Sequence, residues 1–181
     1  MQPAGLISQL GRYWVKSMRG ESLPAASLTL QGIEGDRSYA FVQAASRSSF
    51  PWLTARELPE LLCYKAVATQ DNADAAEITV VTPAGRTFPV ESEDLRLELE
   101  ARSGRPLYLL HDYRGSFDAA PVSLIARQTV ARIAEESGTQ EDPWRFRPSL
   151  LIDLQAGAPF DELNWVGRIL RIGESARIAV T

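Results

Sequence analysis

The sequence predicts a mainly β protein of the α+β class, and three observations support this prediction. Most apolar segments are short, glycine and proline turns separate them at close spacing, and two segments show helical periodicity instead. Many short strands joined in this way are typical of a closed or sandwiched β structure. With 181 residues, the chain is long enough for one large domain or two small ones.

The extended segments follow one another along most of the chain. A β-hairpin is expected where residues 77–82 and 87–90 flank the turn Pro83-Ala84-Gly85-Arg86. A polar loop tip is expected at residues 71–75. The other predicted strands comprise residues 5–10, 13–15, 27–30, 38–42, 62–69, 107–110, 150–154, 165–173 and 176–180.

Two helices interrupt the strands. The first is predicted over residues 93–102, with Ser92 as its N-cap and Gly104 just beyond its end. The second is predicted over residues 129–137 and is stopped by Gly138. A domain junction is placed near residues 103–106, directly after the first helix.

Composition excludes several classes of function. Twenty-three acidic residues outnumber nineteen basic ones, so the chain lacks the broad positive charge that attracts nucleic acid. No apolar run approaches the length of a membrane span, and the first residues lack the features of a secretion signal. We therefore expect no nucleic-acid or membrane partner and a cytoplasmic location.

The chain contains one cysteine and one histidine, so Cys and His alone cannot form a disulfide framework or an ordinary zinc site. Cys63 lies in an apolar, strand-like run and is expected to be a small buried hydrophobe. His111 ends another apolar run. A hydrogen bond to backbone is expected there, and no nearby nucleophile supports a role as general base.

The segment from Asp142 to Asp153 is the best candidate for an anion site. Arginine presents a planar fork of donors that matches phosphate or carboxylate. Because alternate residues of an extended segment face one side, Arg145 and Arg147 are expected to point together, with Pro148 holding Arg147 in extended geometry. The alternative is that both arginines form ion pairs with Asp142 and Asp153.

Two further segments with a basic residue also allow both a ligand-binding and a purely structural interpretation. Lys16 and Ser17 lie in a polar segment that suits either a phosphate cradle or an exposed turn, because it lacks the glycine spacing of a P-loop. Arg37 follows a glycine turn at the start of a strand. Its side chain is expected either to reach a pocket or to pair with Asp36 or Glu34.

Taken together, these segments resemble the MOSC family, named for the C-terminal domain of molybdenum-cofactor sulfurase, together with its N-terminal β-barrel partner domain. The resemblance covers nearly the whole chain and is closest to bacterial relatives of the mitochondrial amidoxime-reducing component. The motifs that carry it are Val15-Lys16-Ser17, residues 32–37 before an aromatic strand, residues 53–59, Thr82-Pro83-Ala84-Gly85, Phe117-Asp118 with Pro121-Val122-Ser123, residues 145–148, and Trp165-Val166-Gly167.

The resemblance implies a β-barrel domain over residues 1–104 and a MOSC-type β-barrel with one or two helices over residues 105–181. A molybdenum–pterin cofactor, which ends in a phosphate, would lie between them. Ser149 stands where the family usually has asparagine after Arg-Pro. By similarity the cofactor-binding positions are Lys16, Ser17, Arg37 and Arg147, with Thr54, Arg56, Ser123 and Arg145 as neighbours.

The implied activity is reduction of N-hydroxylated compounds, with sulfur transfer to a metal centre as a second possibility. Electrons would come from a separate electron-transfer protein, because the chain has no cysteine set for an iron–sulfur cluster and no dinucleotide fingerprint. Relatives continue past a strand like residues 176–180 into an Arg-Cys segment whose thiolate ligates molybdenum, whereas this sequence ends at Thr181. Two interpretations follow: either this sequence is a fragment with an incomplete MOSC domain, or the protein does not hold molybdenum in the family's manner. We expect no protein ligand to the metal within this sequence and leave the catalytic residues unassigned.

Two other interpretations remain. The family is also associated with pyridoxal phosphate, but Lys65 lies in no motif for a Schiff base. The other alternative is a non-catalytic binding or interaction module, in which the arginine pocket is structural or holds another small anion.

Overall fold

The computed structural model describes residues 3–69 and 77–181, so the polar loop expected at residues 71–75 lies outside the described part. The chain forms two compact units, each assembled from separate stretches. Unit 1 comprises Met1–Gly11, Leu23–Leu28 and Val122–Thr181, and unit 2 comprises Arg12–Ser22 and Thr29–Pro121. The domain boundary at residues 104/105 stays a prediction.

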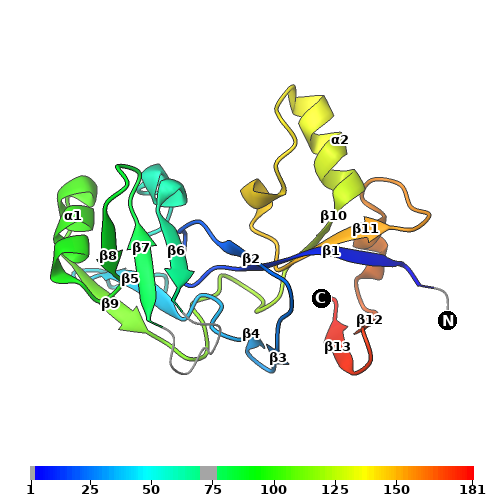
Figure 1. The fold of residues 1–181 in the computed structure, drawn as a ribbon, viewed down its shortest axis with the longest axis horizontal. Helices are drawn as coiled ribbons and strands as arrows, with labels where there is room; N and C mark the ends of the chain where they lie inside the picture. Colours follow the sequence, from blue (N-terminus) through cyan, green and yellow to red (C-terminus); the bar gives the residue numbers. More distant parts are fainter. Residues whose placement is uncertain (1–2, 70–76) are drawn as a thin grey trace. The chain divides into compact units, whose positions relative to one another are not determined.

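Short strands dominate the described residues, and two α-helices accompany them (Figure 1). The α-helices are α1 (Glu93–Ser103) and α2 (Arg127–Ser137), and the 3-10 helices are η1 (Pro59–Cys63), η3 (Pro143–Phe146) and η4 (Asp161–Trp165). The strands are β1 (Gly5–Arg12), β2 (Glu21–Leu23), β3 (Leu28–Thr29), β4 (Gly32–Ile33), β5 (Tyr39–Gln43), β6 (Lys65–Ala68), β7 (Ile78–Val81), β8 (Thr87–Pro89), β9 (Leu107–His111), β10 (Leu124–Ala126), β11 (Leu150–Leu154), β12 (Ile169–Ile172) and β13 (Ala176–Ala179).

Unit 2 contains a three-stranded sheet in the order β6-β7-β8 and the antiparallel pair β5-β9. Helix α1 lies beside β8 and β9 (Figure 1), and its buried Leu95 and Leu99 share one face because they are four residues apart. The core of this unit also contains Val15 and Met18 from the segment after β1, and Tyr64 after η1.

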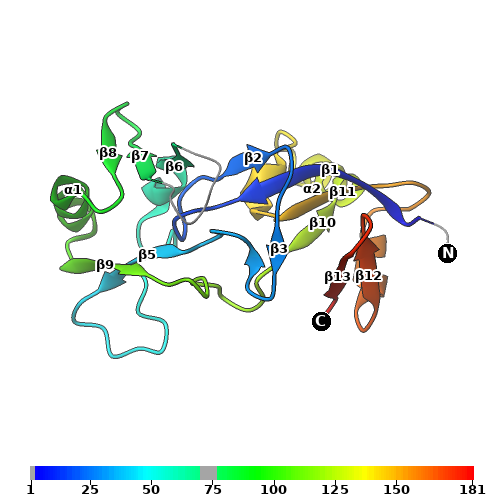
Figure 2. The ribbon, with the colours of Figure 1, turned by 60° about the horizontal axis from the view of Figure 1, so that its bottom comes forward.

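Unit 1 contains β10, β11 and most of β1, which are neighbours in that order in one sheet. Strand β11 is central and pairs parallel with β10 and antiparallel with β1. Its Leu150, Ile152 and Leu154 form a small core with Ala126. The hairpin β12-β13 forms a separate two-stranded sheet (Figure 2).

A buried glutamate caps helix α2. Ala126 occupies the N-cap position of α2 and has no side-chain acceptor for the free N–H groups of the first turn. Glu162 of η4 supplies one instead, because its Oε1 accepts a hydrogen bond from Ala126 N at 3.0 Å and its Oε2 accepts one from Thr129 Oγ1 at 2.9 Å. Glu162 is 6% exposed, so these bonds are shielded from water.

Several sequence predictions are confirmed, namely the mainly β character, both helices with their C-terminal glycines, and the hairpin β7-β8. No sheet among residues 3–69 and 77–181 closes into a barrel. None of the helices in this described part has the length and apolar character needed to cross a bilayer.

The prediction for Cys63 is wrong, and that for Ser92 is confirmed in position only. Cys63 is exposed, because Pro59 starts η1 and this turn occupies residues that were expected to begin a strand. Ser92 is the N-cap residue of α1, but its side chain makes no capping hydrogen bond.

Candidate functional site

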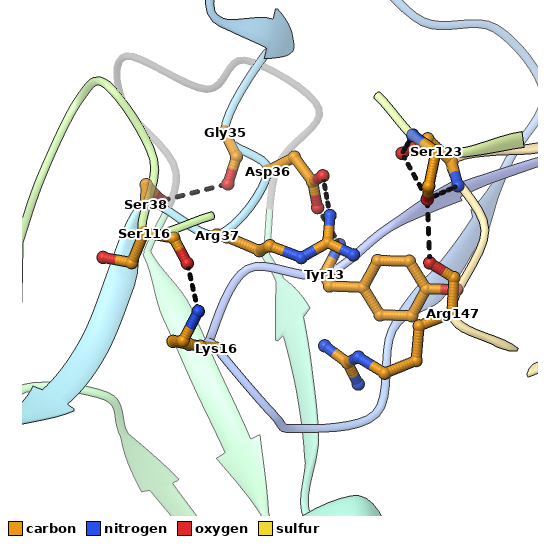
Figure 3. Close-up of polar contacts among 10 residues, drawn as sticks. Tyr13, Lys16, Gly35, Asp36, Arg37, Ser38, Ser116, Ser123 and Arg147 are labelled. Atoms are coloured by element: carbon orange, nitrogen blue, oxygen red, sulfur yellow. Dashed lines mark hydrogen bonds and ion pairs between the residues drawn. The ribbon is translucent and has the colours of Figure 1, made fainter. Parts of the chain in front are cut away.

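Lys16 is a buried cation held by the loop that follows β9. Its backbone N–H donates to Tyr39 O at 2.8 Å, which ties the segment after β1 to β5. Its Nζ donates to Ser116 O at 2.6 Å and forms an ion pair with Asp118 (Figure 3 shows the Ser116 bond). Lys16 is 6% exposed, whereas the Asp118 side chain is 55% exposed. The Ser116 carbonyl therefore fixes the buried ammonium group of Lys16, and the other partner of this group, the Asp118 carboxylate, faces solvent.

Aromatic rings cover the same ammonium group. The Lys16 Nζ lies 4.5 Å from the ring centroid of Trp52 and 5.4 Å from that of Phe50. These two rings pack edge to face at 4.7 Å between centroids. Cation–π attraction of this kind holds a desolvated ammonium in place without neutralising it.

Arg37 is fixed by a carboxylate and two rings. It forms an ion pair with Asp36, whose Oδ1 accepts a hydrogen bond from Tyr13 N at 2.7 Å (Figure 3). The guanidinium carbon lies 4.8 Å from the ring centroid of Tyr13 and 5.6 Å from that of Phe117. The pairing with Asp36 was one of the two alternatives predicted for Arg37.

Ser116 connects the two cations. Its backbone N–H donates to Arg37 O at 2.8 Å, and its carbonyl accepts from Lys16 Nζ. The preceding residue, Gly115, has φ +80°, and a Cβ there would lie 2.2 Å from the Phe117 ring. Glycine is therefore needed for the loop to bring Ser116 between Lys16 and Arg37.

Three predicted site residues share an uncommon backbone conformation. Ser17, Arg37 and Arg147 have φ values of 65°, 53° and 51°, in the left-handed region that residues with a Cβ rarely adopt. Phe160 is the fourth such residue among the described non-glycine positions. Backbone strain of this kind is often found at functional sites, where the surrounding structure maintains it.

The prediction that Arg145 and Arg147 extend from one side of a strand is wrong. Pro143 begins η3, and Asp142 caps it by accepting a hydrogen bond from Trp144 N at 3.0 Å. Arg147 ends this turn in a left-handed conformation, and Pro148 prevents the helix from continuing. The two arginines therefore do not alternate as they would on an extended segment.

The alternative ion pairs proposed for these arginines are also absent from the described residues. Asp142 accepts the bond from Trp144, while Asp153 accepts a hydrogen bond from Gln128 Nε2 at 2.9 Å. Neither acid is paired with Arg145, which is exposed, or with Arg147.

In unit 1, Ser123 and Ser149 position Arg147. The Ser149 hydroxyl accepts from Ser123 N at 3.2 Å, and the Ser123 hydroxyl accepts from Ser149 N at 3.1 Å. Ser123 Oγ also donates to Arg147 O at 3.3 Å (Figure 3). Because Ser149 is fully buried, this reciprocal pair fixes the backbone where β10 and β11 begin.

Thr54 and Arg56 belong to a separate turn. Thr54 Oγ1 donates to Glu57 Oε2 at 2.5 Å, and Thr54 N donates to the same oxygen at 3.0 Å. Burial opposes ionisation of Glu57, but these hydrogen bonds outweigh it and hold the pKa of this carboxyl below its usual range. Arg56 is exposed, so the Thr54 hydroxyl serves the turn and Arg56 faces solvent.

The structure thus arranges the predicted residues in two groups and one separate turn. Lys16, Ser17 and Arg37 belong to unit 2, and Ser123, Arg145, Arg147 and Ser149 belong to unit 1. Convergence of both groups on one ligand stays a prediction. Sequence reasoning assigned no role to Ser116 or Asp118, although the Gly115-Ser116-Phe117-Asp118 loop contains a turn glycine that signals close backbone approach.

The fold and these residues define a mainly β protein in which a buried lysine and a partly buried arginine lie against aromatic rings. The model of the MOSC N-terminal beta barrel domain matches residues 4–136, and the chain belongs to this family. The match confirms the family seen in the sequence motifs and is consistent with a protein associated with the molybdenum cofactor. A comparison with curated proteins found no match.

Proposed function

We propose that the chain binds the molybdenum–pterin cofactor and that Lys16, Ser17 and Arg37 hold its phosphate-bearing end. The observation that carries this proposal is the link through Ser116, which places two largely buried cations on one loop. Arg147, whose backbone Ser123 and Ser149 fix, is assigned to the same ligand by family resemblance.

The residues present fit the phosphate of such a group. A phosphate requires several converging donors, and a lysine and an arginine are the usual providers. Asp118 is more than half exposed, so a phosphate can take its place beside Lys16 without burying a second unpaired charge. Asp36, in contrast, has a fully buried side chain, so it remains with Arg37 and orients the guanidinium.

No residue of this chain is assigned as a ligand for the metal. No group of three or more His, Cys, Asp or Glu in the described residues could hold a metal ion. The single cysteine, Cys63, is exposed in η1. The proposal therefore concerns recognition of the organic, phosphate-bearing part of the cofactor.

When bound, such a cofactor would supply oxygen-atom transfer for the reduction of N-hydroxylated compounds. The second possibility is that the protein carries sulfur for metal–sulfur cofactors. The contribution of this chain would be to bind and orient the cofactor. In the reductase reaction, electrons would come from a separate protein. The relationship to bacterial relatives of the amidoxime-reducing component is part of this proposal.

A specific observation favours a second candidate, a non-catalytic module in which the cations are structural. Both Lys16 and Arg37 already have carboxylate partners, Asp118 and Asp36, and such pairs are common in proteins without any ligand. The two candidates predict different behaviour towards phosphate and cofactor.

The deciding experiment expresses the full chain in a host that makes the cofactor and measures molybdenum and pterin in the purified protein. Cofactor binding predicts that both co-purify with the wild type, are lost in Lys16→Gln and are retained in the control Lys65→Gln. Titration with inorganic phosphate adds a second readout, because Asp118→Asn should increase phosphate affinity by exposing Lys16. A wild type without pterin, together with no phosphate response in Asp118→Asn, would establish the structural alternative.

A further inference from the structure

A second candidate site lies in unit 2 and does not depend on the cofactor proposal. It is a pocket of about 250 Å³, smaller than the cavities that hold drug-sized ligands. Four aromatic residues, Trp14, Tyr39, His111 and Tyr113, line it together with the acidic Glu34 and Asp36. No lysine or arginine belongs to its lining among the described residues.

Three of the rings form a stack. Tyr39 and His111 are cross-strand partners on β5 and β9, and their rings stack at 4.2 Å between centroids with an interplanar angle of 11°. Tyr113 continues the stack, with its centroid 4.5 Å from that of His111. Tyr39 is buried and Tyr113 is 83% exposed, so the stack leads from the core of the unit to solvent.

The two acidic residues of the pocket, Asp36 and Glu34, differ in whether their carboxylates form ion pairs. Asp36 is committed to Arg37 and to Tyr13 N. Glu34 is exposed, and its carboxylate forms no ion pair within residues 3–69 and 77–181. One uncompensated negative charge therefore faces solvent beside the aromatic rings.

We propose that this pocket binds a small quaternary ammonium compound. The face of an aromatic ring attracts a cation, and a group of rings with a nearby carboxylate recognises an ammonium whose methyl groups prevent hydrogen bonding. Anionic ligands are disfavoured because the lining carries acids and no basic lysine or arginine. Tyr113 and Glu34 are the residues that set this preference.

The test uses the intact chain and compares choline with 3,3-dimethylbutan-1-ol, a neutral molecule of the same shape. Isothermal titration calorimetry is expected to show choline binding at millimolar concentration or below and about tenfold weaker binding of the alcohol. Equal affinities would overturn the proposal, since shape alone would then explain binding. Absence of choline binding would overturn it as well.

Variants locate the site. Tyr113→Ala and Glu34→Gln are each expected to weaken choline binding about three- to tenfold. Tyr108→Ala, which removes a half-exposed tyrosine of β9 outside the pocket, should leave it unchanged. Tyr113→Phe keeps the aromatic ring and should therefore bind choline with the affinity of the wild type. Circular dichroism checks that each variant is folded, and unchanged binding in folded Tyr113→Ala would contradict the assignment.

Discussion

Lys16 Nζ lies 2.6 Å from the carbonyl oxygen of Ser116, although 100 residues separate them along the chain. Through the backbone N–H of Ser116, the same residue also holds the carbonyl of Arg37. One residue of the loop after β9 thus fixes both Lys16 and Arg37. Its side-chain oxygen is buried and has no hydrogen-bond partner among the described residues, so its backbone provides these links.

The first prediction concerns Lys16. Lys16→Gln should destabilise the protein by about 1–3 kcal/mol, because the buried Ser116 carbonyl loses a charged donor. Urea unfolding measures this difference. The control Lys65→Gln removes an exposed lysine and should change the unfolding free energy little. Equal stability of wild type and Lys16→Gln would mean that Lys16 does not support the loop.

The second prediction separates strain from chemistry at Ser17, whose φ is 65°. Ser17→Gly relieves the steric cost of a left-handed residue and should stabilise the protein by up to about 1 kcal/mol. Ser17→Ala keeps this cost but removes the hydroxyl. If Ser17 binds an anion, both variants should bind phosphate more weakly than wild type, while thermal unfolding shows a higher Tm only for the glycine variant. A lower Tm for Ser17→Gly would refute the strain argument.

The third prediction follows from the lowered pKa of Glu57. A lowered pKa means that the ionised form is favoured in the folded state, so its stabilisation is present above the unfolded pKa and is lost as pH falls through the folded pKa. Thr54→Val removes the hydroxyl donor and should raise the pKa of Glu57 towards its ordinary value.

NMR titration of the Glu57 carboxyl measures that change directly. Urea unfolding across acidic pH gives an independent check, because the part of the stability difference that depends on Glu57 ionisation should disappear once the residue is protonated in both proteins. A stability difference that is constant with pH would show that Thr54 acts through packing instead.

The fourth prediction concerns the cap of helix α2. Glu162→Ala should destabilise unit 1 by about 2–3 kcal/mol, since Ala126 N and Thr129 Oγ1 lose their buried acceptor. The exposed Glu136→Ala on the same helix serves as control. Hydrogen exchange should show faster exchange at the first turn of α2 in Glu162→Ala only. Unchanged protection would show that α2 is held by its packing on β11.

Local patterns predicted much of the fold. Both helices and the hairpin β7-β8 follow from periodicity, caps and turn residues that act over a few positions. The cap on α2 was not predictable in this way, because its acceptor comes from Glu162, more than thirty residues beyond Ala126. The turn at η3 was missed because the Pro143 signal was outweighed by the strand-like pattern that follows it.

For the site, the sequence predicted the basic residues better than the groups that hold them. Lys16, Ser17 and Arg37 were found through motifs, and the structure brings Lys16 and Arg37 to one loop. The pairing of Arg37 with the adjacent Asp36 was one predicted alternative, whereas the ion pair of Lys16 with Asp118 was not found, because it depends on tertiary folding that no local spacing encodes. The predicted roles of Arg145, Thr54 and Arg56 remain untested.

The pairing of β1 with β11 has a consequence for biosynthesis. Strand β1 is synthesised well before its partner β11, which begins at Leu150. All residues of unit 2 are synthesised by Pro121, so this unit can fold while β1 still presents unpaired backbone groups. Until β11 is synthesised, the edge of β1 that pairs with it has no partner strand, and an unpaired strand edge of this kind favours aggregation.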